Sequence, residues 1–579
     1  MEDWDQYTWV VVLGAFTAFF TAYGIGANDV ANAFASSVGS KALTLTQAVI
    51  IGAIFEFGGA VLLGSQVTDT VRKKIADKSA FAEDPEVLMY GFLCVLLATG
   101  IWLLLATFLE LPVSTTHSVI GGIIGMSLVA HGSDAVVWYK YDSSKEALKK
   151  FSGVVPVIIS WVVSPLLSGL AASFLFYTVR MFILRSPRSF ERSLIFFPFL
   201  VGVTIAVNAY FIIYKGFSRK VTINGEKKKL HEHLGPLWSS VIAWGLGAII
   251  GLVLHFAFVP WLRKRGLAVG QAAAAKDNLA LEDTKPEGKE GVEGAAATQA
   301  ATGNTANKAL TMLDKDLHSI VKSDDAVQNV HDNAENFAVE TEEAFRFLQV
   351  FTAMCDSFAH GANDVANSIG PFAGIYGIYN EMKVESKSEV PIWILVLGGF
   401  GIVVGLATYG HTIIRAIGVK LTKISPSRGF TIELGSATII IIGSRYGIPL
   451  STTHCQVGAT VGVGLLEGVG GVNGMLFLKV IGGWLITLVV VGFTSAAFFA
   501  QAIYAPSIPN LRTIARYEQG VFAANEDLIA ALGTDTIEGI DGNASELNAE
   551  YDELNIDTSA KQLSILSPAL AALIDTCSA

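Results

Sequence analysis

An internal repeat constrains the fold of this chain more than any other feature of its 579 residues. The segment GANDVAN occurs at residues 26–32 and again at 361–367. A second pair, PVSTTHS at 112–118 and PLSTTHC at 449–455, follows in the same order. The offsets are 335 residues for the first motif and 337 for the second, so the two motifs recur together. This recurrence indicates a duplication, and it predicts a fold with two related halves.

Long apolar stretches dominate both halves. The chain is 52% hydrophobic and 16% charged, with a mean hydropathy of +0.50. Apolar runs near the roughly 20 residues needed to cross a bilayer begin near residues 8, 43, 88, 152, 194, 236, 345, 391, 430 and 474. Two blocks, about 119–130 and 455–466, are too short to span alone and are predicted to form arms of re-entrant hairpins. The sequence therefore predicts an all-α polytopic membrane protein, and duplicated halves of this kind are typical of secondary transporters.

Polar stretches divide the membrane part into two. We expect a first membrane half at 1–260, a flexible polar linker at 261–341, a second membrane half at 342–505 and an acidic tail at 506–579. The linker is rich in Ala, Gly, Glu, Lys and Asp, a composition that does not bury a core. The chain has no basic patch with interleaved aromatic residues, so nucleic acid is not an expected partner.

Each GANDVAN copy places polar side chains inside an apolar run. In the first copy, Asn28 and Asp29 can share a helix side with Asn32, because they lie four and three residues before it. A carboxylate inside a bilayer is costly unless it meets a cation, a partner or water. Carboxylate and amide oxygens suit an alkali cation, although a hydrogen-bond network between helices would use the same residues. The second copy repeats the set as Asn363, Asp364 and Asn367.

Each STTH copy has the sequence of a helix start. It follows a proline and precedes a glycine-rich apolar block, which predicts a helix beginning at the hydroxyl residues. The backbone N–H groups at such an end point outward, so they can bind an anion together with the hydroxyls. An ordinary N-cap would need the same residue types. The candidate residues are Ser114, Thr115, Thr116, Ser451, Thr452 and Thr453.

Two glutamates and a histidine also lie in apolar surroundings. Glu56 and Glu433 are not equivalent under the repeat, because Glu56 lies 58 residues before Ser114 whereas Glu433 lies 18 before Ser451. Either could belong to a cation site, a proton site or a gate, or could form a structural hydrogen bond. His360 directly precedes the second GANDVAN copy. Like the histidine that ends each STTH copy, it could orient a polar cluster or form an ordinary interhelical hydrogen bond.

The doubled motifs closely resemble those of the inorganic phosphate transporter family, the sodium-dependent phosphate symporters. The segment SPSRGFTIELGSA at 425–437 is similar to a signature of the eukaryotic branch. The resemblance covers both membrane halves, roughly residues 8–260 and 342–505. It implies about twelve membrane segments, including helical hairpins, in two inverted repeats whose broken helices carry the Asn-Asp pairs.

The resemblance also implies partners and roles. Phosphate and sodium would be the partners, with sodium as coupling ion and no further cofactor. Phosphate would be bound by the six hydroxyl residues of the STTH copies, with help from Asn28 and Asn363. The implied sodium ligands are Asp29, Asn32, Asp364 and Asn367, and the candidates for transport or gating are Glu56, Glu433 and His360.

The chain is therefore expected to be a sodium-coupled symporter that imports phosphate, and not an enzyme. The plasma membrane is the expected location, because no organellar presequence is evident, and the chain could contact lipid and form a homodimer. A proton-coupled phosphate or sulfate transporter of the same fold is the main alternative, since carboxylates also take up protons and sulfate also fits a hydroxyl cradle. An intramembrane enzyme with Asp29 and Asp364 as paired carboxylates is less favoured, because no separate nucleophile is evident.

Overall fold

The computed structural model describes residues 4–64, 78–82, 84–141, 143, 151–213, 220–223, 226–282, 317–384, 390–446 and 450–504. Within these ranges, eight helices are long and apolar enough to cross a membrane. They are Asp5–Gly39, Leu45–Leu63, Pro85–Phe108, Val154–Leu184, Ser189–Tyr210, His233–Ala257, Ile392–Tyr409 and Gly474–Ile503. The acidic tail predicted at 506–579 lies outside the described residues, as does 283–316 of the linker.

In its described ranges, the first half is helical apart from two small hairpins. Its elements up to the first short helix are η1 (Trp4–Tyr7), α1 (Thr8–Ile25), the π-helix η2 (Gly26–Val30), α2 (Ala31–Gly39), α3 (Leu45–Leu63), η3 (Lys78–Phe81), α5 (Pro85–Phe108) and α6 (Thr115–His131). The next are η4 (Gly132–Ala135), β1 (Lys140–Tyr141), β2 (Phe151–Ser152), α7 (Val154–Val179), the π-helix η6 (Arg180–Leu184), α8 (Ser189–Phe211), β3 (Lys220–Ile223), β4 (Glu226–Lys229), α9 (Leu230–Ala257) and α10 (Val259–Glu282). β1 pairs antiparallel with β2 and β3 with β4, which the all-α prediction did not include.

The second half repeats the order of the first. A long helix carrying GANDVAN is followed by an apolar helix, a second long helix, a short helix starting at STTH and a final long helix. These five are α13 (Val339–Glu381), α14 (Ile392–Tyr409), α16 (Pro426–Tyr446), α17 (Thr452–Leu465) and α18 (Gly474–Ile503). The remaining elements are η8 (Ser319–Lys322), α12 (Asp325–Asp332), α15 (His411–Arg415), the π-helix η9 (Ala416–Leu421) and η10 (Val469–Gly471).

Part of the stretch predicted as a flexible linker is helical. α10 continues to Glu282, past the expected end of the first half at residue 260. The segment QAAAAKDNLALE within it is rich in Ala, Leu, Lys and Glu, which have high helix propensity even without an apolar face. Further on, the Asp324 side chain caps α12 by accepting hydrogen bonds from the backbone N–H groups of Ala326 and Val327.

The helix is not broken at either GANDVAN copy, contrary to the expectation of broken helices. In the first copy, α1 passes into α2 through the five-residue π-helix η2, which contains Asn28 and Asp29. In the second copy, the 43-residue α13 stays α-helical through Asp364. The π-turn widens the helix at the acidic residue, a deviation often found at functional sites. The same heptapeptide therefore gives two different backbone geometries.

Glycines interlock the two halves. A Cβ on Gly26 or on Gly405 would come within 1.9 Å of a backbone oxygen of the facing helix, so η2 and α14 cross with their backbones in contact. A Cβ on Gly361 or on Gly59 would come within 2.1 Å of a backbone oxygen in the same way, where α13 crosses α3. Small residues permit such close crossings between membrane helices. Each GANDVAN helix therefore packs against a helix of the other half.

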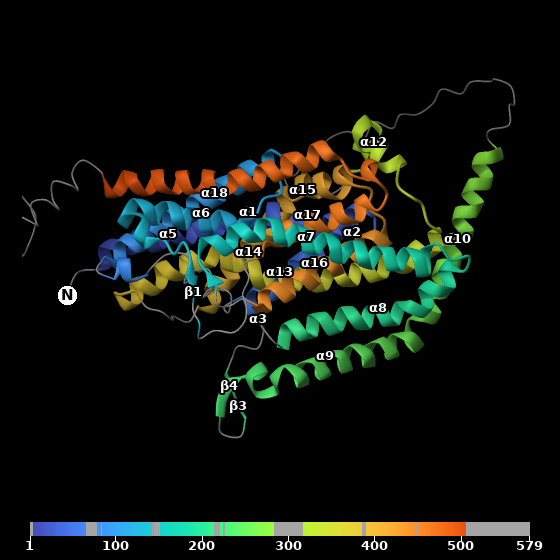
Figure 1. Ribbon diagram of the computed structural model, residues 1–579, viewed down its shortest axis with the longest axis horizontal. Coiled ribbons are helices and arrows are strands. Elements are labelled where there is room, and N and C mark those ends of the chain that lie inside the picture. Colours follow the sequence, from blue (N-terminus) through green and yellow to red (C-terminus); the bar gives the residue numbers. More distant parts are fainter. Residues whose placement is uncertain are drawn as a thin grey trace, which may run out of the picture. The chain divides into compact units, whose positions relative to one another are not determined.

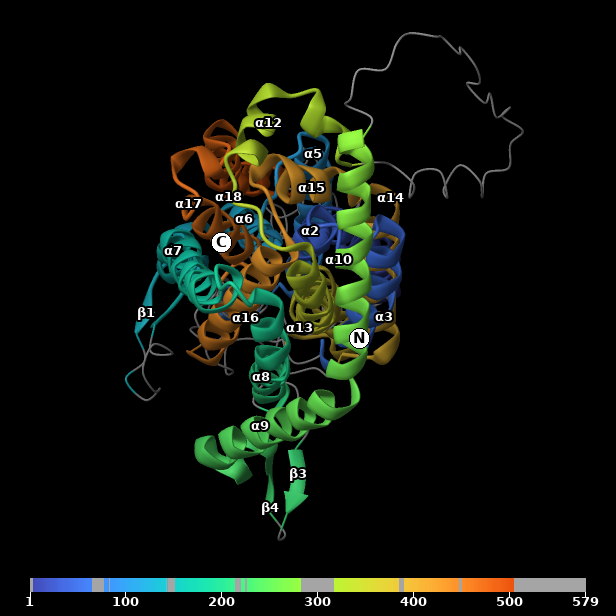
Figure 2. The ribbon, with the colours of Figure 1, turned by 90° about the vertical axis from the view of Figure 1, so that its right-hand side faces the viewer.

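The short helices α6 and α17 lie among the long ones, whereas α8 and α9 pack on each other at the edge of the helix group (Figures 1 and 2). α9 exposes large apolar side chains such as Trp238, Ile249 and Phe256. Exposed apolar faces of this size fit contact with lipid.

Candidate functional site

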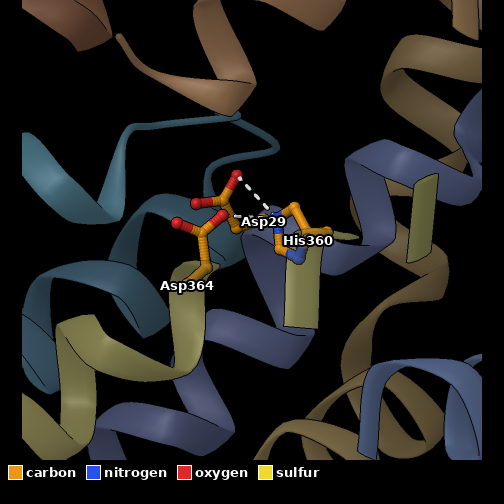
Figure 3. A group of neighbouring side chains, drawn as sticks. All are labelled: Asp29, His360 and Asp364. Atoms are coloured by element: carbon orange, nitrogen blue, oxygen red, sulfur yellow. Dashed lines mark ion pairs between the residues drawn. The ribbon is translucent and has the colours of Figure 1, made fainter. Parts of the chain in front are cut away.

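Asp29 and Asp364 meet inside the protein although they lie 335 residues apart. Asp29 lies on η2 and Asp364 on α13, and His360, one turn earlier on α13, lies between the carboxylates (Figure 3). Its Nε2 is 2.7 Å from Asp364 Oδ2 and 3.9 Å from Asp29 Oδ1. The three side chains are buried, and one ligand atom of each lies within 4.8 Å of the others. This arrangement could hold a cation.

Hydroxyls of both STTH copies reach these carboxylates. Thr115 Oγ1 donates to Asp29 Oδ2 at 2.9 Å, and Thr453 Oγ1 donates to Asp29 Oδ1 at 2.5 Å. Thr452 Oγ1 lies 3.0 Å from Asp364 Oδ2 and 3.4 Å from Asp29 Oδ1, so it touches the carboxylates of both halves. The residues predicted for the anion and those predicted for the cation therefore form one site.

We call the starts of α6 and α17, with their hydroxyl residues 114–116 and 451–453, the tips. Thr116, the third hydroxyl residue of the first tip, is linked to the site by the amide of Asn367. Asn367 Nδ2 donates to Thr116 Oγ1 at 3.2 Å and to Asp364 Oδ1 at 3.1 Å. This amide links the start of α6 in the first half to α13 in the second. Each of the four residues predicted as sodium ligands is at most 4% exposed, and they are Asp29, Asn32, Asp364 and Asn367.

Ser114 and Ser451 are the N-caps of α6 and α17, as the sequence predicts. Ser114 Oγ accepts from the backbone N–H of His117 at 3.3 Å, and Ser451 Oγ accepts from that of His454 at 3.2 Å. The earlier N–H groups of each helix have no partner within the helix. The partial positive charge of a helix N-terminus adds to these donors, so each tip suits an anion.

The two tips meet through the histidines that follow them. The rings of His117 and His454 pack edge to face, with centroids 4.9 Å apart, and both are buried. Neither ring has a hydrogen-bond partner among the described residues, so the expected interhelical hydrogen bond is not formed. His454 instead stacks on Trp484, with centroids 4.0 Å apart. The contact brings together the starts of α6 and α17, which are equivalent under the repeat.

Asn28 and Asn363, equivalent under the repeat, have different surroundings. Asn28 Nδ2 donates to Thr107 Oγ1 at 3.0 Å and to the Leu111 carbonyl at 2.9 Å, and Oδ1 accepts from Val113 N at 2.9 Å. These bonds hold the loop that leads into α6. Asn363 Nδ2 donates to a carbonyl of its own helix at 3.1 Å, and the side chain lines a cavity beside Asp29.

This cavity is small and has both polar and apolar lining residues. It has about 20 Å³ of free volume, which is room for about one water-sized particle. Its lining includes Asp29, Asn32, His360, Asn363 and Thr452. A water or a small cation fits this volume, whereas an anion of several heavy atoms does not.

Glu56 and Glu433 occupy different places. Glu56 Oε2 lies 3.2 Å from His360 Nδ1, so it joins the carboxylate site through the imidazole. Glu433 Oε1 accepts from Ser36 at 2.6 Å and from Ser37 at 2.8 Å, while its Oε2 accepts from Thr352 at 2.5 Å. Glu433 therefore ties α2 and α13 to α16.

Sequence reasoning missed Asp356, which lines the same cavity. It lies four residues before His360 and eight before Asp364, so all three lie on one side of α13. That spacing is visible in the sequence, but Asp356 lies outside the repeated motif, so the repeat does not mark it.

Comparison with known proteins identifies the family of the chain. The sequence pattern of the phosphate transporter family matches residues 25–495. The chain belongs to the phosphate transporter family. A phosphate-repressible phosphate permease of Neurospora crassa is 33% identical over 86% of this chain and 98% of its own length. The sodium-dependent phosphate transporter 2 of Felis catus is 29% identical over 86% of this chain and 99% of its own.

A solved structure described as the sodium-dependent phosphate transporter is also similar. It matches with a TM-score of 0.63 and 29% identity, over 86% of this chain and 99% of that one. The family and the apolar helices identify the chain as a multi-pass membrane transporter. The resemblance inferred from the doubled motifs is thereby confirmed.

Proposed function

We propose that the chain is a sodium-coupled symporter that carries inorganic phosphate by alternating access. The observation that carries this proposal is the position of Thr452 Oγ1, which lies 3.0 Å from Asp364 Oδ2 and 3.4 Å from Asp29 Oδ1. A donor suited to phosphate thus touches acceptors suited to cations. Relatives named as sodium-dependent phosphate transporters support the choice of ions.

The hydroxyls provide a physical route from cation binding to phosphate binding. Thr115, Thr452 and Thr453 donate to Asp29 or Asp364, so these donors are engaged. A sodium ion at a carboxylate compensates the negative charge in their place. The hydroxyls can then turn toward phosphate, together with the N–H groups that begin α6 and α17.

Charge explains why cations and anion would move together. Uncompensated carboxylates are costly in a low-dielectric barrier, and so is a phosphate without cations. A loaded site is close to neutral and can cross as the halves rearrange. With an inside-negative potential, each excess positive charge adds about 2.3 kcal/mol per 100 mV.

The packing of the halves supports alternating access through inverted repeats. The order of elements recurs, and each GANDVAN helix packs on a helix of the opposite half through glycine contacts. The cavity beside Asp29, lined by residues of η2, α2, α13, α16 and α17, is too small for phosphate, so these elements have to move apart to admit it. A rearrangement of one repeat against the other would supply that opening.

Uptake of labelled phosphate into proteoliposomes tests the proposal, with either Na⁺ or choline outside. We expect uptake at least about tenfold faster in Na⁺, since the carboxylates need a cation. Asp29→Asn and Asp364→Asn should abolish the difference, whereas the exposed Asp325→Asn on α12 should not. Equal uptake in Na⁺ and choline would reject sodium coupling. Uptake that rises on acidification without Na⁺ would favour the proton-coupled alternative, and transport of labelled sulfate that competes equally with phosphate would favour a sulfate transporter.

A further inference from the structure

We propose that Asp356, Asn32 and Ser436 form an additional site for an alkali cation in the cavity beside Asp29. This site would set how many cations accompany each phosphate. The inference rests on the sodium coupling proposed above. It adds Asp356, an acidic residue outside the two GANDVAN copies, to the candidate cation ligands.

The helix geometry separates this site from the Asp364 carboxylate. Asp356 precedes Asp364 by eight residues on α13, which is about 12 Å along the helix axis at 1.5 Å per residue. A single ion cannot bind both carboxylates across that distance. Yet Asp356, His360 and Asn363 line the same cavity, because their spacing of four and three residues keeps them on one side of the helix.

Buried oxygen atoms without partners face this cavity. Asn32 and Ser436 line it and are each 1% exposed, and neither Asn32 Oδ1 nor Ser436 Oγ has a hydrogen-bond partner within the described ranges. Asp356 forms no hydrogen bond or ion pair in that part of the chain either. A buried polar atom without a partner is unfavourable, and an unpaired carboxylate is more so. A bound ion with positive charge would therefore compensate the Asp356 carboxylate and the unpartnered oxygen atoms that line the cavity.

The types of side chain that line the cavity determine which ion it would bind. Carboxylate, amide and hydroxyl oxygens are hard ligands, which favour alkali and alkaline-earth cations over softer metals. The free volume of about 20 Å³ admits one water-sized particle and excludes phosphate. Gln456 also lines the cavity with an unpartnered Nε2, and a half-turn of its amide would present the oxygen instead.

The extra carboxylate changes the number of cations that neutralise the site. Asp29, Asp356, Asp364 and Glu56 surround His360, so four acids face one base. Replacing Asp356 by asparagine removes one negative charge and leaves the other groups in place. The loaded site should then be neutral with one sodium ion fewer.

Dual-isotope flux in proteoliposomes tests this site. Labelled Na⁺ and labelled phosphate are counted together for the wild type, Asp356→Asn and Asp356→Glu. Cys355→Ala is the matched control, since Cys355 neighbours Asp356 but does not line the cavity. We expect Asp356→Asn to carry phosphate with one Na⁺ fewer per phosphate and a lower Hill coefficient for Na⁺. Asp356→Glu and Cys355→Ala should keep the wild-type ratio.

The outcomes separate this inference from the function on which it rests. A wild type that moves no Na⁺ with phosphate would reject sodium coupling itself. A sodium-coupled wild type with the same ratio in Asp356→Asn would overturn only the additional site. If Asp356→Asn does not fold, Ser436→Ala provides the same test through the Na⁺ dependence of uptake, and an unchanged apparent Na⁺ affinity would count against the site. A lost proton flux with an unchanged Na⁺ ratio would also overturn it.

Discussion

Asn28→Ala tests whether this side chain holds the first hairpin tip. Its three hydrogen bonds, of 2.9 to 3.0 Å, join Thr107, the Leu111 carbonyl and the Val113 N–H. At about 1 kcal/mol each, their loss costs about 3 kcal/mol. Val113 directly precedes Ser114, so this energy is lost where the tip begins. If the tip has to be re-formed on binding, about 3 kcal/mol corresponds to roughly 100-fold weaker phosphate binding.

Equilibrium binding of labelled phosphate in Na⁺, together with the thermal unfolding midpoint, measures both parts of the effect. Asn208→Ala is the matched comparison, because the Asn208 Nδ2 donates at 2.9 Å to the Thr204 carbonyl of its own helix, α8. We expect Asn28→Ala to lower both affinity and midpoint, and Asn208→Ala to leave the phosphate affinity unchanged. Thr107→Val removes one acceptor, so it should cost about 1 kcal/mol and be non-additive with Asn28→Ala.

An Asn28→Ala variant that weakens phosphate binding but leaves the unfolding midpoint unchanged would refute this role of Asn28. That result would mean that the amide contacts phosphate directly instead of holding the loop before α6. Additive effects of Asn28→Ala and Thr107→Val would also contradict the contact seen between them.

Three further predictions follow from the packing. Ser114→Ala and Ser451→Ala each remove an N-cap worth about 1 kcal/mol and a tip hydroxyl, so the KM for phosphate should rise about tenfold, and unchanged uptake would reject the tips as the anion site. Arg428→Leu removes the 2.6 Å partner of the buried Glu467 and leaves it only the longer contact with Arg180 at 3.5 Å and the Glu335 N–H, which should cost about 3 kcal/mol and lower the unfolding midpoint; an unchanged midpoint would show that the pair does not matter. Glu433→Gln weakens hydrogen bonds worth about 2 kcal/mol between α2, α13 and α16, so it should slow transport at an unchanged KM, and a raised KM would place it in the phosphate site.

Much of the fold is visible in local sequence patterns. The helix starts at Ser114 and Ser451 follow from the Pro-Ser-Thr order, because an N-cap is a local property. The packing of η2 against α14 is not visible in local sequence patterns, because it depends on how closely Gly26 and Gly405 allow two backbones far apart in sequence to approach. The helix α10 within the stretch predicted as a linker was missed for another reason: the Ala-rich composition of a linker is also that of a stable helix.

The part of the site that comes from the two repeated motifs was predictable from the sequence. Duplication alone indicates that Asp29 and Asp364 lie near each other, and the structure brings them together around His360. Symmetry cannot reveal that Asn28 and Asn363 differ, since their heptapeptides are identical while their neighbours are not. Nor can it reveal Asp356, which has no counterpart in the first copy because Thr21 precedes Gly26 by the same five residues.

The central claim is that phosphate rests on hydroxyl donors freed by cations at Asp29 and Asp364. Reciprocal binding to the purified protein tests it most directly, with phosphate affinity measured across Na⁺ concentrations and Na⁺ affinity across phosphate concentrations. Because linkage is reciprocal, each ligand should tighten the other by the same factor, and that factor should fall to about one in Asp29→Asn, Asp364→Asn protein. A phosphate affinity that is the same in Na⁺ and in choline, or coupling that survives loss of both carboxylates, would contradict the account.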